Sequence, residues 1–76
     1  NINLNIISTD HTEVDAFRAS VVDEIYKTTS GTLYIDGFSN LNNERQDIIL
    51  SLIESIKLDA SVNYFIAIEY KKYQIH

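Results

Sequence analysis

The sequence predicts an α/β fold in which two crossover helices connect a small three-stranded parallel sheet, in the order β-α-β-α-β. Two observations carry this prediction. Three stretches have the apolar patterns of strands, and the two segments between them repeat apolar residues at spacings of three and four. The connections are long enough for right-handed parallel crossovers. With 76 residues the chain has room for one domain, residues 1–76, with a modest core.

The first strand is expected over residues 1–7, where isoleucine and leucine alternate with asparagine. A helix is expected to follow, because Thr12 and Asp15 have the spacing of a capping box. The apolar residues of this helix fall on one face at spacings of three and four. They are Val14, Phe17, Val21 and Ile25.

The centre of the sequence is a short apolar strand, residues 32–35, that leads into the carboxylate of Asp36. Gly31 precedes it and can take the left-handed conformation that ends the first helix. A loop and a second helix over 42–57 follow, with Asn40 or Asn42 as its cap. Its apolar stripe is broad: Ile48, Ile49, Leu52, Ile53 and Ile56.

The third strand is expected over 62–70, and its run 64–68 is apolar on both faces. If both crossovers are right-handed and the strands add in one direction, both helices lie on the same face of the sheet. The opposite face then stays bare and needs another cover. A protein partner or a second copy of the chain is therefore expected.

Composition narrows the classes of partner and compartment. The net charge of −5 leaves no basic field for a phosphate backbone, so direct nucleic-acid binding is not expected. The chain has no cysteine, which excludes disulfides and thiolate metal sites. No apolar run approaches the roughly 20 residues that cross a bilayer, so no membrane association is expected and a cytoplasmic protein is predicted.

The central stretch resembles the Walker B strand and following helix of the sigma-54-dependent transcription activators, which are AAA+ ATPases. The matching residues are Gly31-Thr32-Leu33-Tyr34-Ile35-Asp36, Asn40-Leu41, Glu44, Gln46, Ile49-Leu50 and Ile53. Over 31–54 the match needs no gap, and the flanking strands agree more weakly. The resemblance implies three neighbouring strands of a partial AAA+ core, with Asp36 as a Walker B-like cofactor ligand.

The chain also departs from that family. It has no P-loop to cradle phosphates, and Gly37 stands where the family has the glutamate that polarises the attacking water. The family's Thr-Asn corresponds to Glu69-Tyr70, and only residues 9–30 lie where its sigma-contacting loop would be. We therefore expect no catalytic residue, no bound cofactor and no metal.

Other groupings have structural explanations. His11 beside Asp10 could suggest a general base with an orienting carboxylate, but no candidate nucleophile is tied to them by spacing. Asp23-Glu24 could suggest a cluster for a divalent cation, but a solvated charged face of a helix explains these neighbours. Asp36 is expected to accept hydrogen bonds from 37–40 or to cap the following helix.

Three functional hypotheses remain open. The first is a non-catalytic regulatory or protein-interaction module related to the activator core, truncated and self-associated. The second is a fragment of a larger ATP-hydrolysing sigma-54-dependent activator whose P-loop lies outside this chain. The third is a small α/β module of other ancestry, receiver-like or inhibitor-like, in which Asp36 only mimics the motif.

Overall fold

The computed structural model describes residues 1–59 and 65–68. The elements in chain order are β1 (Ile2–Asn3), α1 (Leu4–Asp10), α2 (Val14–Lys27), β2 (Thr32–Asp36), the 3-10 turn η1 (Phe38–Asn40), α3 (Asn43–Lys57) and β3 (Phe65–Ile68). All strand pairs are parallel and β2 is central, in the order β1-β2-β3. The predicted α/β class and the three-stranded parallel sheet are confirmed, although the first crossover holds two helices.

The first strand is shorter than predicted. Residues 1–7 were expected to be extended, but β1 ends at Asn3 and α1 begins at the next residue. The Asn3 side-chain oxygen accepts hydrogen bonds from the backbone N–H groups of Asn5 (3.0 Å) and Ile6 (3.2 Å). These bonds satisfy two of the free N–H groups of the helix start, so asparagine acts here as a cap.

The apolar residues of this segment also follow a helical spacing. Leu4 and Ile7 are three positions apart and both are buried, whereas Ile6 is 58% exposed. An extended chain would have placed Leu4 and Ile6 on the same face. The segment was mispredicted because it fits two patterns at once. Ile2, Leu4 and Ile6 alternate as in a strand, whereas Leu4 and Ile7 have the spacing of one helix face.

Helix α2 has the predicted apolar face but not the predicted cap. Phe17, Val21 and Ile25 are buried, which confirms the stripe. The N-cap is Glu13, whose side chain makes no capping hydrogen bond, so the capping box expected at Thr12 is wrong. The backbone carbonyl of Thr12 accepts a hydrogen bond from Arg45 on α3 instead.

The elements around β2 agree with the sequence prediction except at the end of the first helix. Gly31 has φ +80°, the left-handed conformation that glycine adopts most readily, but it does not end α2. Helix α2 already ends at Lys27, with Thr28 as a C-cap in extended conformation. After the turn, Asn42 caps α3, because its side-chain oxygen accepts from the Arg45 N–H at 2.9 Å. Ile49 and Ile53 are buried on the inner face of α3.

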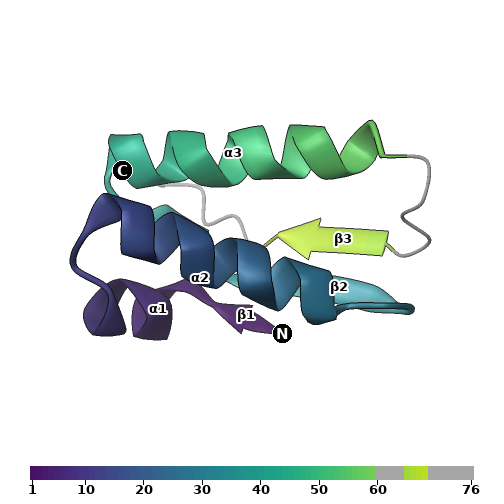
Figure 1. Ribbon diagram of the computed structural model, residues 1–76, viewed down its shortest axis with the longest axis horizontal. Helices are drawn as coiled ribbons and strands as arrows, with labels where there is room; N and C mark the ends of the chain where they lie inside the picture. Colours follow the sequence, from purple (N-terminus) through teal and green to yellow (C-terminus); the bar gives the residue numbers. More distant parts are fainter. Residues whose placement is uncertain (60–64, 69–76) are drawn as a thin grey trace, which may run out of the picture.

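Both long helices cover the same face of the sheet. Leu33 and Ile35 of β2 belong to one apolar cluster with buried residues of α2 and of α3. Figure 1 shows α2 lying across the strands and α3 running beside it. Among the described residues, the opposite face is bare along β2, as predicted, and its residues there are exposed: Thr32, Tyr34 and Asp36.

Strand β3 lies in register with β2, with Ile66 opposite Leu33 and Ile68 opposite Ile35. Both isoleucines therefore belong to the helix-covered side, where Ile66 packs against the core and Ile68 is 36% exposed at the margin. The rest of the strand expected over 62–70 lies outside the described residues. In the part of the chain that the structure describes, no helix is long and apolar enough to cross a membrane.

Candidate functional site

The carboxyl ends of β1 and β2 lie at the same edge of the sheet, where open α/β folds bind ligands. Asp36 ends β2 and is opposite Asn3, the last residue of β1. Its side chain is exposed and has no hydrogen-bond partner in the described structure. The expected structural role of Asp36 is therefore wrong: the carboxylate accepts nothing from 37–40, and Asn42 caps α3.

Gly37 follows Asp36 in a closely packed left-handed turn. It has φ +88°, and a Cβ atom added to it would lie 3.0 Å from Asn5 Nδ2 and 3.2 Å from the Asn5 backbone nitrogen. Asn5 is held in place because its side-chain oxygen accepts from Asn40 Nδ2 at 3.2 Å. The start of α1 thus closes over this turn, and a glutamate at position 37 has neither the backbone conformation nor the space it needs.

Gln46, which matches the family pattern, has a structural contact. Its Nε2 donates to the backbone carbonyl of Phe38 at 3.2 Å in a partly buried position. Phe38 is buried against the core. Gln46 therefore fixes the turn η1 onto the first part of α3, which holds the loop after β2 in one conformation.

Arg45 connects α3 to the end of α1. Its Nη2 donates to the carbonyl of Thr12 at 2.6 Å and its Nη1 to the carbonyl of His11 at 3.3 Å. The guanidinium carbon lies 4.7 Å from the centre of the Phe17 ring, within the range of a cation–π contact. Since His11 is the C-cap of α1, the positive charge also lies at the negative end of that helix.

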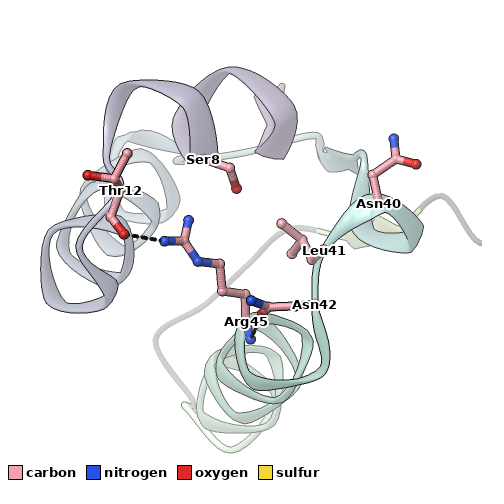
Figure 2. Close-up of a pocket in the computed structure, with 6 residues that line it drawn as sticks. All are labelled: Ser8, Thr12, Asn40, Leu41, Asn42 and Arg45. Atoms are coloured by element: carbon pink, nitrogen blue, oxygen red, sulfur yellow. Dashed lines mark hydrogen bonds between the residues drawn. The ribbon is translucent and has the colours of Figure 1, made fainter.

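A hollow of about 470 Å³ opens beside this guanidinium, between α1, the turn after β2 and the start of α3. Figure 2 shows the Ser8 hydroxyl directed into the space that Arg45 and Leu41 border. Ser8 Oγ is buried and has no hydrogen-bond partner. The hollow is lined by Ser8, Thr12, Asn40, Leu41, Asn42 and Arg45.

The remaining candidates do not form a chemical site. Asp36 does not line the hollow. Asp23 and Glu24 both pair with Lys27 at 3.2 Å on the exposed face of α2. Among residues 1–59 and 65–68, no three His, Cys, Asp or Glu side chains are grouped to hold a metal ion.

Sequence reasoning did not find Ser8 and Arg45, because their contacts join segments more than thirty residues apart in the sequence. One signal was present. Arg45 is a cation in the first turn of a helix, where the helix dipole disfavours positive charge, so it needs a compensating partner.

Comparison with protein-family models, with curated proteins and with solved structures finds no match.

Proposed function

We propose that this chain is a cytoplasmic, non-catalytic protein-interaction or regulatory module, similar to part of a sigma-54 activator AAA+ core and acting in bacterial transcription regulation. The observation that carries the proposal is the uncovered face of the sheet. Tyr34 lies at the middle of β2 on that face and is 57% exposed. Its neighbours on the same face of β2, Thr32 and Asp36, are exposed as well.

An exposed tyrosine on a rigid strand is well suited to a protein interface. Tyrosine supplies a large contact area with few rotatable bonds and a hydroxyl that can bind at the polar rim. Among the described residues, α2 and α3 pack on the opposite face of the sheet, so a partner can reach Tyr34 without rearranging the core. A second copy of the chain is the simplest partner, in a twofold arrangement.

Two features support the relation to the activator core. The central position of the strand that ends in Asp36, between two parallel neighbours, is what the resemblance implies for a Walker B strand. The turn packing that excludes a side chain at Gly37 supports the non-catalytic part of the proposal, because the family's glutamate has no place there.

Light scattering with a matched pair of variants tests the interaction surface. We expect wild-type protein at tens of micromolar to exceed the monomer mass of 8.7 kDa, and Tyr34→Glu to return to it. The control is Tyr26→Glu on α2, where the tyrosine is 78% exposed but away from the sheet face. A wild type that stays monomeric, or equal effects of both substitutions, would contradict self-association through this face.

The alternative, a fragment of a larger ATP-hydrolysing activator, is favoured by one observation. The Asp36 carboxylate is exposed and unpaired, which leaves its oxygens free to bind Mg²⁺. Calorimetry with Mg-ATP separates the two proposals. We expect no saturable heat from the wild type, and saturable heat that Asp36→Asn abolishes would favour the alternative.

A further inference from the structure

The hollow beside Arg45 is bordered by hydrogen-bond donors that have no acceptor in the described structure. The Ser8 hydroxyl is buried and makes no hydrogen bond. Leaving such a group without a partner is unfavourable, so buried hydroxyls nearly always have one. A molecule that supplies an acceptor in the hollow would satisfy it.

Arg45 adds positive charge and further donors at the same place. The carbonyls of His11 and Thr12 take two of its N–H groups, and a guanidinium carries more than two. The two carbonyl hydrogen bonds and the contact with the Phe17 ring, 4.7 Å from the guanidinium carbon to the ring centre, hold the guanidinium at the border of the hollow.

The lining of the hollow also determines the charge of a suitable ligand. No aspartate or glutamate is among the lining residues, and Arg45 is the only charged group among them. The start of α3 at Asn43 adds the positive end of a helix dipole. Donors and positive charge without a carboxylate select an acceptor that is negatively charged.

We propose that this hollow binds a small oxyanion, a carboxylate or phosphate group, through Ser8 and Arg45. The site is separate from Asp36 and from the bare sheet face, so it does not depend on the function proposed above. The net charge of −5 disfavours large polyanions, which limits the ligand to a compact anionic group.

Nuclear magnetic resonance of the isotope-labelled full chain, with inorganic phosphate and acetate as probes, tests the proposal. The pH is held constant, and sodium chloride at equal ionic strength is the control. We expect saturable shifts at Ser8, Thr12, Asn42 and Arg45 with an oxyanion and none with chloride. Saturation by phosphate alone identifies a phosphate site, and saturation by acetate alone identifies a carboxylate site.

Ser8→Ala gives the sharper result, because it removes the proposed contact without removing any hydrogen bond of the free protein. We expect it to fold and to bind the oxyanion about tenfold more weakly. Ser51→Ala, on the exposed side of α3, is the matched control and should bind like the wild type.

Arg45→Lys keeps the charge and loses the planar guanidinium, so it should also weaken binding. Shifts that do not saturate, shifts that chloride reproduces, or an affinity that Ser8→Ala leaves unchanged would each overturn the proposal.

Discussion

The two ends of the central strand β2 each carry a glycine in a left-handed conformation, yet they differ in what surrounds it. At the amino end, Gly31 has φ +80° and nothing within 4 Å of where a Cβ would lie. At the carboxyl end, Gly37 has φ +88°, and a Cβ atom added to it would lie 3.0 Å from Asn5 Nδ2. The first glycine serves only the backbone turn, whereas the second also makes room for another segment.

This difference shows where the fold concentrates its polar contacts. The carboxyl end joins α1, the turn η1 and the start of α3 through Asn5, Asn40, Arg45 and Gln46. The amino end is a connection between α2 and β2, and its exposed ion pairs lie on α2 alone. Substitutions at the carboxyl end should therefore have larger effects than similar substitutions at the amino end.

The largest expected difference is between the two glycines. Gly31→Ala should cost about 1 kcal/mol, the usual strain of a left-handed alanine. Gly37→Ala adds the overlap with Asn5 and should cost about 3 kcal/mol in total. Urea denaturation of both variants measures the difference. Equal losses would show that the contact with Asn5 relaxes freely and that the two ends are alike.

Arg45→Met tests the connection between α3 and α1. Methionine keeps the apolar stem but loses both carbonyl hydrogen bonds and the contact of the charge with Phe17, so the free energy of unfolding should fall by about 2 kcal/mol. Arg18→Met, at an exposed position of α2, is the control and should change it by less than about 0.5 kcal/mol. Similar results for both variants would show that the contacts of Arg45 do not stabilise the fold.

Ser8→Ala should act in the opposite direction in the absence of a ligand. Removing a buried hydroxyl that has no partner should raise the free energy of unfolding by about 1 kcal/mol. Thermal unfolding in an oxyanion-free buffer measures this gain against Ser51→Ala. A loss of stability would mean that the hydroxyl has a partner in solution.

The smallest effect is expected for Lys27 at the end of α2. Hydrogen bonds to Asp23 and then Glu24 raise the pKa of its ammonium group above the ordinary value. A raised pKa gives stability that is present at neutral pH and lost as the pH rises through the folded-state pKa. Because Lys27 is fully exposed, Lys27→Gln should leave the denaturation midpoint at pH 7 unchanged within error. A clear loss would make the amino end more important than its geometry suggests.

The fold could be predicted where one period dominates. The short apolar run of β2 and the broad apolar stripe of α3 predicted elements whose bounds agree closely with the structure. The start of the chain was mispredicted, because Ile2 and Leu4 fit a strand while Asn3 also caps a helix. Local patterns cannot separate these alternatives when a cap residue lies inside an alternating run.

The candidate site was predictable only in part. The position of Asp36 at the end of a strand could be predicted from the sequence. Its lack of a hydrogen-bond partner could not, because it depends on which residue caps α3, and both Asn40 and Asn42 were possible caps. The Ser8 and Arg45 pairing depends on how α1 packs against α3. Since α1 was itself expected to be partly strand, its contacts could not be derived.

The register of the sheet has a consequence for how the chain folds. In both strand pairs the partners are 33 residues apart, as for Ile2 with Ile35 and Thr32 with Phe65. No contact between the described strands is therefore local, and each pairing must close a long loop before it gains any free energy. We expect the helices to form and dock first, with strand pairing as the slow step, so that the folding rate is low for a chain of this length.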